Sequence, residues 1–382
     1  MVTETDRAAD GNRLQDLADL VTDTPRIVVD RSILGANIRR MADRAAAAGV
    51  ALRPHVKTHK MPQIARLAVE AGAVGVQVAK LGEAEVMADV GFDDILVAYP
   101  IVGTVKLDRL TALAGRARVT VSLDSLVAAR GISQAMHDRG TTCRLLVEVD
   151  TGLHRIGVQP SEALALGRQI AELPSVELAG VLTHEGHIYT AAANVVEMER
   201  MTQDACRTVL EIAAQMRASG LPAPVVSVGS SGTARFGMAV PGITEVRPGT
   251  YVFNDLTQVE LGAAQESDIA ACVVATVVSR PAADRAVIDA GTKTLSSDQR
   301  IVPAAQRSFG RLAGWPDTWI VRASEEHGVL GLTPESPLKI GDRVAIIPNH
   351  ICAVINLHDD VLVAEDGRIV DRWPVAARGH LQ

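Results

Sequence analysis

Short apolar runs alternate with Ala-rich segments of helical period over the first two-thirds of the chain. Runs such as LLVEV and DILVAY are continuously apolar, which is typical of strands buried on both faces of a sheet. The runs predict eight strands, at 50–54, 75–79, 95–99, 119–123, 145–150, 178–183, 225–229 and 245–247. Eight strands alternating with helices favour an α/β fold in which a parallel sheet closes into a (β/α)8 TIM barrel. A doubly wound open sheet is the alternative.

The alternation of strands and helices ends at about residue 258, after which short strands follow one another without long helical segments. Turn signals such as PAAD, EEHG and EDGR separate these strands. This pattern predicts a smaller antiparallel β domain, with strands at 271–279, 286–290, 319–322, 328–332, 342–347 and 361–364. A further strand at 27–30 has no place among the eight and is expected to pair with that domain. The predicted division is therefore an N-terminal segment (1–30), a barrel (31–257) and a C-terminal β domain (258–382).

Composition narrows the class of protein. The 382 residues are 47% hydrophobic and 22% charged, which suits a globular protein long enough to bury a large core. A net charge of -7 and 3% aromatic residues argue against nucleic acid and anionic membranes as partners. We expect a small-molecule substrate instead.

Several features of the sequence bear on its compartment. No apolar run approaches the roughly 20 residues that span a bilayer, and the N-terminal stretch MVTETDRAADGNRLQDLADL lacks the pattern of a signal peptide. The four cysteines are widely spaced without a CxxC motif, so they do not predict a disulfide framework. A cytoplasmic enzyme is the expectation, with Cys143, Cys206 and Cys272 as small buried hydrophobic residues.

Polar side chains gather after the predicted barrel strands. Catalytic groups in such barrels collect at the C-terminal ends of the strands. Read in strand order, these positions hold His55, Lys57 and His59; Gln77 and Lys80; Tyr99; Asp124; Asp150, His154 and Arg155; His184, Glu185, His187 and Tyr189; Ser230, Ser231, Gly232 and Thr233; and Arg247, Gly249, Thr250 and Tyr251.

Lys57 lies in RPHVKTHK, directly after the first barrel strand. Desolvation and the positive charge of Arg53, His55, His59 and Lys60 are expected to lower its pKa. A neutral amine is what a Schiff base with an aldehyde requires. A solvated loop lysine is the alternative, and the polar ring around it favours the reactive amine.

Gly229–Thr233, with the sequence GSSGT, follows the seventh strand. Small residues here let backbone N–H groups and hydroxyls approach a phosphate closely. The run has neither the Lys-Ser/Thr of a Walker A loop nor GxGxxG spacing, so it does not indicate a dinucleotide site. The stretch RPGTY at 247–251 adds a second small turn and a hydroxyl. A plain turn is the alternative interpretation.

His350 and Cys352 stand two residues apart in PNHIC. On an extended chain that spacing places both side chains on one face, where they can hold a divalent cation. Imidazole with thiolate suits zinc more than magnesium. Because the motif supplies only two ligands, water and substrate would fill the other coordination positions of the metal. A buried cysteine beside a hydrogen-bonded histidine is the alternative.

Eight motifs taken together resemble one enzyme family. RPHVKTHK, GVQVAKLGEAEVMADVGFDDILVAYPIVG, EVDTGLHRIGV, HEGHIY, VGSSGT, RPGTYVFND, DAGTKTLSSD and PNHIC occur in this order through nearly the whole chain. With them the chain is similar to the D-threonine aldolase and D-serine dehydratase family, the metal-dependent, fold type III relatives of alanine racemase that use pyridoxal 5'-phosphate (PLP).

The resemblance implies a PLP-binding barrel, a C-terminal β domain with the metal ligands, and a homodimer with sites near the subunit interface. It implies that Lys57 carries PLP and that His350 and Cys352 hold a divalent metal, with Zn²⁺ favoured and Mn²⁺ or Mg²⁺ as alternatives. The remaining cofactor-binding residues that it implies are Gln77, Arg155 and Tyr189 around the ring, and Ser230, Ser231, Gly232, Thr233 and Tyr251 around the phosphate.

Two reaction paths fit this set of residues. PLP delocalises charge at the substrate Cα, and a metal lowers the pKa of the β-hydroxyl. If His184 or His187 removes the hydroxyl proton, the Cα–Cβ bond breaks and glycine and an aldehyde form. If Lys57 instead removes the Cα proton, hydroxide leaves and deamination follows.

The first path predicts a D-threonine aldolase type of lyase acting on D-3-hydroxy amino acids. The second predicts D-serine dehydratase or a 3-hydroxy-D-aspartate lyase. An amino-acid racemase would leave the PNHIC motif unexplained, and a non-catalytic PLP carrier would need no second domain.

Overall fold

The computed structural model describes residues 13–192, 194–301 and 307–382. The first twelve residues of the predicted segment 1–30 therefore lie outside the described residues. The chain divides into two compact units. The barrel unit comprises residues 39–57, 62–249 and 379–382, and the β unit comprises the described residues within 1–38, 58–61 and 250–378.

The barrel unit is built on a parallel sheet, in which eight strands fall within the described ranges. Its strands are β2 (Ala51–Leu52), β3 (Val76–Val78), β4 (Asp94–Val97), β5 (Arg118–Leu123), β6 (Cys143–Glu148), β7 (Val176–Leu182), β8 (Val225–Val228) and β9 (Glu245–Val246). They pair in the order β2-β9-β8-β7-β6-β5-β4-β3.

Backbone hydrogen bonds also join the two ends of this order. The Val74 amide donates to the Leu52 carbonyl at 2.9 Å, and the Gln77 amide donates to the Pro54 carbonyl at 2.9 Å. His55 and Gln77 form a parallel bridge. The predicted TIM-like barrel is confirmed.

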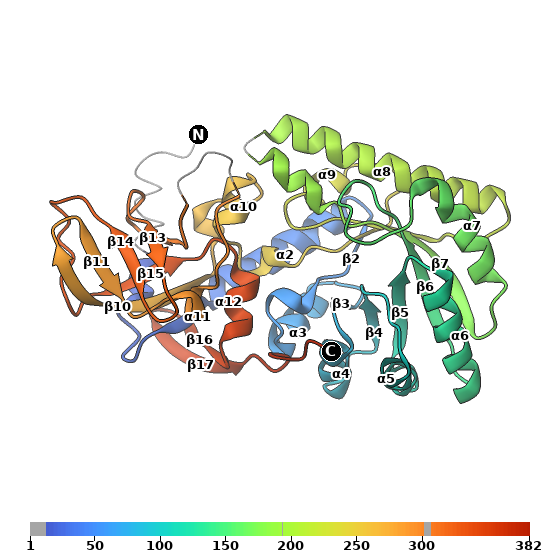
Figure 1. Ribbon diagram of the computed structural model, residues 1–382, viewed down its shortest axis with the longest axis horizontal. Helices are drawn as coiled ribbons and strands as arrows, with labels where there is room; N and C mark the ends of the chain where they lie inside the picture. Colours follow the sequence, from blue (N-terminus) through green and yellow to red (C-terminus); the bar gives the residue numbers. More distant parts are fainter. Residues whose placement is uncertain (1–12, 193, 302–306) are drawn as a thin grey trace. The chain divides into compact units, whose positions relative to one another are not determined.

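Helices connect the barrel strands, and Figure 1 shows α5, α6 and α7 along the outer side of β5, β6 and β7. These helices and turns are α2 (Arg31–Ala47), which runs from the β unit into the barrel unit, η1 (Val56–Thr58), α3 (Pro62–Glu70), α4 (Leu81–Asp89), α5 (Thr104–Ala114), α6 (Leu126–Arg139), α7 (Pro160–Ala171), η2 (Gly186–Ala191), α8 (Val195–Ala218) and α9 (Ala234–Gly237).

Local capping explains where the longer helices begin and end. The Ser125 hydroxyl accepts a hydrogen bond from the Ala128 amide at 3.3 Å, and Gly140 ends α6 in the left-handed conformation. The Asn194 side chain accepts from the Glu197 amide at 3.1 Å at the start of α8.

A glycine permits close packing between β7 and β8. Gly180 has φ +134°, and a Cβ built on it would lie 2.0 Å from the Val225 carbonyl oxygen. Any other residue would push the two strands apart. Their pairing carries the predicted loop at Gly229–Thr233 to its place beside the end of β7.

The β unit is a mostly antiparallel sheet with a path β13-β14-β11-β10-β1-β16-β17, to which β15 and β12 attach through β10. Its strands are β1 (Arg26–Asp30), β10 (Ala271–Ala282), β11 (Arg285–Ile288), β12 (Arg311–Leu312), β13 (Ile320–Ala323), β14 (Gly328–Gly331), β15 (Arg343–Ile347), β16 (Asp360–Glu365) and β17 (Arg368–Pro374). As expected for the strand at 27–30, β1 pairs antiparallel with β10 and parallel with β16. Val28 and Cys272 lie in the core that this pairing creates.

Short helices complete the β unit. They are η3 (Thr250–Val252), α10 (Leu256–Glu260), η4 (Glu266–Asp268), α11 (Thr292–Leu295) and α12 (Ile351–Leu357). The expectation of an extended chain at His350–Cys352 is wrong, because Cys352 lies in the first turn of α12 and His350 is its N-cap. Burial of Ile351, Val354 and Ile355 on one side stabilises the helix, although the run ICAVI has strand-like composition. Among the described residues, no helix is long and apolar enough to cross a membrane.

Candidate active site

Lys57 lies in η1, just past the end of β2, and its side chain is half-buried. Its positive charge is one cause of the lowered pKa of both His55 and His184, so the three side chains are neighbours in the barrel unit. Burial is the larger cause for both histidines, and Arg247 adds to the effect. Both imidazoles are therefore neutral near pH 7.

The cationic neighbours of Lys57 differ from those expected. The Arg53 guanidinium donates to Glu245 at 2.7 Å and to Asp94 at 2.9 Å, so its charge is neutralised by two carboxylates. Burial lowers the pKa of His59 to about 3, so His59 carries no charge. Arg247 supplies the positive charge that the sequence led us to expect from Arg53 and His59.

Arg247 is buried and donates to three groups of the barrel. Its Nε donates to the Ser227 hydroxyl at 2.8 Å, its Nη1 donates to the Gln77 side-chain carbonyl at 3.2 Å, and its Nη2 donates to the Thr183 carbonyl. Gln77, which the resemblance assigns to the cofactor ring, is thus held by a guanidinium. Sequence reasoning named Arg247 only as a strand-end residue and gave it no role.

His184 and His187 occupy different surroundings. Arg155, although exposed, contributes to the low pKa of His184 after burial, Lys57 and Arg247. Burial also lowers the pKa of His187, but the carboxylates of Glu185 and Asp150 oppose that shift. The structure therefore places His184 beside Lys57 and Arg155, and His187 beside acidic groups.

The GSSGT loop is organised by η2 and by the buried Glu185. The Tyr189 hydroxyl donates to the Ser230 hydroxyl at 3.1 Å and accepts from the Gly232 amide at 3.4 Å. The Glu185 carboxylate accepts from the Thr233 hydroxyl at 2.6 Å and from the Gly229 amide at 3.2 Å. Tyr189 and the loop residues are thus brought together as the sequence suggested.

A second turn also touches the loop. The Gly249 amide donates to the Ser231 hydroxyl at 3.2 Å, which joins RPGTY to GSSGT. Gly229 has φ +102°, a conformation that favours glycine at the start of the loop. The two turns therefore form one small-residue surface next to Tyr189.

These surroundings fit an anionic cofactor with an aldehyde. Lys57, Arg155 and Arg247 place positive charge at one end of the barrel, where each contributes to the low pKa of His184. Small residues and amide groups of the GSSGT loop leave room for phosphate oxygens. The residues present thus suit PLP, with Lys57 to hold its aldehyde and the loop to hold its phosphate.

His350 and Cys352 lie in the β unit with Asp255. His350 Nδ1 is 3.1 Å from Asp255 Oδ2, and Cys352 Sγ is 3.2 Å from the Thr58 hydroxyl oxygen. The negative charge of Cys352 is the largest cause of a His350 pKa raised well above its usual value, so the two side chains face each other. An imidazole facing a thiolate is a donor pair that suits zinc.

This pair offers two candidate ligands for a metal. Within residues 13–192, 194–301 and 307–382, no group of three His, Cys, Asp or Glu side chains is arranged to hold a metal ion. A metal at His350 and Cys352 would therefore keep positions for water or substrate, as in catalytic sites.

Tyr251 lies in η3 and belongs to the β unit, whereas the loop that it was expected to accompany belongs to the barrel unit. Its side chain is buried, and burial raises the pKa of its hydroxyl. Its predicted role at the phosphate stays a prediction.

Comparison with protein families identifies the chain. Residues 29–256 match the model described as alanine racemase, N-terminal domain, and residues 270–364 match the model described as putative serine dehydratase domain. D-threonine aldolase of Arthrobacter sp is 34% identical over 361 residues, which are 94% of this chain and 93% of the relative. The chain belongs to the D-threonine aldolase and D-serine dehydratase family.

Other members of this family are equally similar. D-threo-3-hydroxyaspartate dehydratase of Delftia sp. (strain HT23) is 36% identical over 358 residues, covering 87% of this chain and 92% of the relative. The crystal structure of D-threonine aldolase from Filomicrobium marinum matches with a TM-score of 0.88 at 33% identity, covering 96% of this chain and 98% of that one. A D-threo-3-hydroxyaspartate dehydratase variant in the metal-free form matches with a TM-score of 0.86 at 33% identity, covering 93% and 98%. These relatives are lyases of two kinds.

Two carboxylates of this family member were missed by sequence reasoning. Glu185 appeared only as a strand-end residue, and its partners on the loop after β8 become visible only in the fold. Asp255 had a local signal, because an N-cap Asp followed three residues later by Gln258 is typical of a helix start. Nothing local connects it with His350.

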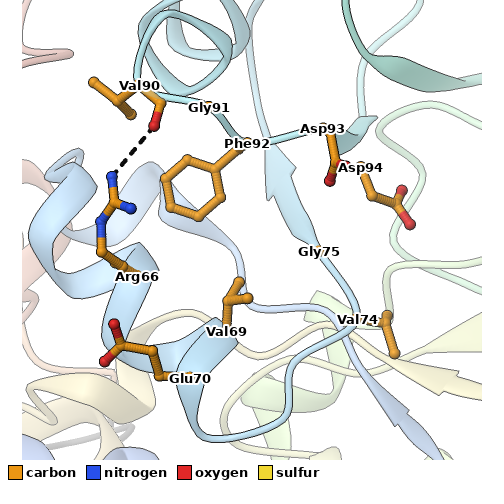
Figure 2. Close-up of a pocket in the computed structure, with 10 residues that line it drawn as sticks. All are labelled: Arg66, Val69, Glu70, Val74, Gly75, Val90, Gly91, Phe92, Asp93 and Asp94. Atoms are coloured by element: carbon orange, nitrogen blue, oxygen red, sulfur yellow. Dashed lines mark hydrogen bonds between the residues drawn. The ribbon is translucent and has the colours of Figure 1, made fainter.

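A pocket of about 290 Å³ lies at the opposite end of the barrel strands (Figure 2). Gly75 precedes β3 and Asp94 begins β4, so the pocket surrounds N-terminal strand ends rather than the C-terminal ends that carry Lys57. The Arg66 guanidinium in its wall donates to the Val90 carbonyl at 3.2 Å. This pocket is therefore separate from the candidate active site.

Proposed function

We propose that this protein is a PLP- and divalent-metal-dependent lyase of the D-threonine aldolase type, which cleaves D-3-hydroxy amino acids to glycine and an aldehyde. The observation that carries the proposal is the neutral imidazole of His184 beside Lys57. Burial and the charges of Lys57, Arg247 and Arg155 lower the pKa of His184. A histidine that is unprotonated near pH 7 has a ring nitrogen that can accept a proton.

Lys57 and the GSSGT loop are the proposed holders of PLP. Lys57 Nζ would hold the aldehyde, Gln77 and Arg155 would contact the ring, and Tyr189 would support Ser230 at the phosphate. When bound, PLP delocalises the negative charge that develops at the substrate Cα. The hydrogen bond from Arg247 holds the side-chain oxygen of Gln77 and so fixes the direction in which its NH2 group points.

His350 and Cys352 are the proposed metal ligands. Their nitrogen and sulfur donors favour Zn²⁺ over Mn²⁺ and Mg²⁺. A divalent metal, when bound, lowers the pKa of a coordinated hydroxyl. The existence of a relative in a metal-free form supports a metal in this family.

The proton steps are assigned to residues of the barrel unit. In aldol cleavage a ring nitrogen of His184 accepts the proton of the substrate β-hydroxyl. His187 is the alternative base: burial lowers its pKa, and Glu185 and Asp150 oppose that shift. The competing dehydratase path uses Lys57 Nζ as the acceptor of the Cα proton, and the Delftia dehydratase at 36% identity supports that alternative.

Product analysis separates the functions. Purified protein with PLP and Zn²⁺ or Mn²⁺ is incubated with D-threonine, D-serine or D-3-hydroxyaspartate. Glycine and acetaldehyde from D-threonine are expected. Pyruvate and ammonia from D-serine, without glycine from D-threonine, would establish the dehydratase instead, and appearance of the L enantiomer alone would establish a racemase.

The assembly and the compartment are also proposals. A homodimer is inferred from the family resemblance and is tested by sedimentation of the purified protein. A cytoplasmic location is supported by the buried Cys143, Cys206 and Cys272, which form no disulfide in the structure. No partner other than a small D-amino acid is proposed.

A further inference from the structure

Asp255 is a fully buried carboxylate that contacts the proposed metal ligand His350. Its Oδ2 lies 3.1 Å from His350 Nδ1 and accepts from the Ile351 amide at 3.0 Å. Its Oδ1 accepts from the Gln258 amide at 2.9 Å. One side chain therefore caps α10 and holds the residue that caps α12.

The contact with Asp255 decides which ring nitrogen of His350 is available to bind a metal. A carboxylate is an acceptor, so the atom that faces it must be the protonated Nδ1. When His350 binds a metal, the lone pair that it uses then lies on Nε2, on the other side of the ring. Metal-binding histidines commonly donate their second ring N–H to a carboxylate, which fixes the tautomer and the ring orientation.

Asp255 also fixes the backbone that carries both ligands. The Ile351 amide lies between His350 and Cys352 in the chain, and its bond to Asp255 anchors the first turn of α12. The Thr257 amide donates to the Asn349 carbonyl at 3.1 Å, which ties the two helix starts together a second time. The convergence of His350 and Cys352 thus depends on a residue about a hundred positions earlier.

We propose that Asp255 is a positioning residue that prepares His350 and Cys352 to bind a divalent metal. The inference rests on the metal site of the proposed function. It assigns Asp255 no contact with the metal or the substrate. Its effect is on the affinity of the apoprotein for the metal.

Metal affinity tests this directly. Full-length apoprotein is titrated with Zn²⁺ against a chromogenic chelator, as wild type, Asp255→Asn and Asp289→Asn. Asn keeps a cap for the Gln258 amide but cannot offer two carboxylate oxygens, and we expect Zn²⁺ affinity to fall by roughly 10–100-fold. Asp289 is a matched control in the same unit, because it accepts from the Thr276 amide at 2.8 Å and from the Thr24 hydroxyl at 2.6 Å without contacting His350.

The outcomes are distinguishable. Wild-type Zn²⁺ affinity in Asp255→Asn would overturn the positioning role. If instead His350→Ala binds Zn²⁺ as tightly as wild type, the metal site of the proposed function is wrong. Equal losses in Asp255→Asn and Asp289→Asn would show a general effect of removing a carboxylate from the β unit and would also overturn the proposal.

A measurement on the unchanged protein keeps the inference testable if Asp255→Asn fails to fold. Long-range ¹H–¹⁵N correlation on histidine-labelled, Zn²⁺-loaded protein reports which ring nitrogen of His350 carries the proton. Protonated Nδ1 with metal-bound Nε2 is expected. Protonated Nε2 would contradict the role of Asp255.

Discussion

The Arg247 guanidinium donates from Nη1 to Oε1 of Gln77 at 3.2 Å, which links the end of β9 to β3. These strands are separated in the ring only by β2. The bond takes one of the two lone pairs of the Gln77 side-chain oxygen and so fixes which end of the amide faces Arg247. A residue predicted to contact the cofactor thus has its orientation fixed by a buried arginine.

Replacement of Lys57 by alanine is predicted to abolish retention of PLP. Lys57 is the half-buried amine next to the neutral His55 and His184. Wild-type protein treated with borohydride should carry a phosphopyridoxyl label on the peptide that contains Lys57, detected by mass spectrometry. Lys57→Ala should be unlabelled, whereas Lys80→Met should keep the label, because Lys80 Nζ stacks 3.8 Å above the Tyr99 ring. Label on another lysine would contradict the assignment.

His184→Asn is predicted to lower kcat for D-threonine cleavage by about 10²–10⁴-fold, the usual contribution of a general base. His187→Asn, the matched change in η2, should have a smaller effect, because Lys57 is among the charges that shift the pKa of His184 and is not among those that shift the pKa of His187. The absorbance spectrum of bound PLP should be retained in both variants. A larger loss in His187→Asn would reverse the two roles.

Arg53→Met is predicted to lower the free energy of unfolding by about 3–5 kcal/mol, because it removes the cation that pairs with the buried Glu245 and one of the two that pair with the buried Asp94. Arg53 bonds to Asp94 and Glu245, both of which are buried. Arg118→Met is the control: it removes another ion pair of Asp94, but its side chain is 63% exposed, so the expected loss is about 1 kcal/mol or less. Urea denaturation of the apoproteins measures both. Equal losses of unfolding free energy in the two variants would show that the buried ion pairs of Arg53 stabilise the fold no more than the exposed ion pair of Arg118.

Acid is predicted to destabilise the protein in part through His59. The pKa of His59 is about 3 in the fold, where its Nδ1 accepts from the Met61 amide at 3.0 Å. The unfolded chain, with a pKa near 6.5, binds the proton more readily, so stability is full above about pH 6.5 and falls as the pH drops toward 3. The contribution lost between pH 7 and pH 5 is about 2 kcal/mol.

His59→Asn removes the titration but keeps an acceptor for the Met61 amide. Its unfolding free energy should therefore fall less between pH 7 and pH 5 than that of wild type, by about 2 kcal/mol. Urea denaturation at the two pH values measures the difference. An identical loss in both proteins would show that His59 is not the titrating group.

The elements of the barrel followed from local sequence, because strand and helix periodicities are properties of neighbouring residues. The eight runs predicted as strands correspond to β2–β9, and the run at 27–30 corresponds to β1 in the sheet of the β unit. The motif RPHVKTHK likewise indicated Lys57 as the candidate reactive amine without any coordinates. Such features are set by propensity, burial on one or two faces, and position after a strand.

Contacts between distant residues were decided by the tertiary structure. Arg53 and Arg247 are both arginines at strand ends, yet the first meets Asp94 and Glu245 while the second meets Gln77. His350 and Cys352 suggested an extended pair and instead begin a helix held by Asp255. The physical reason is that strand register and barrel closure determine which charges lie within hydrogen-bonding distance, and the order of residues along the chain does not contain those distances.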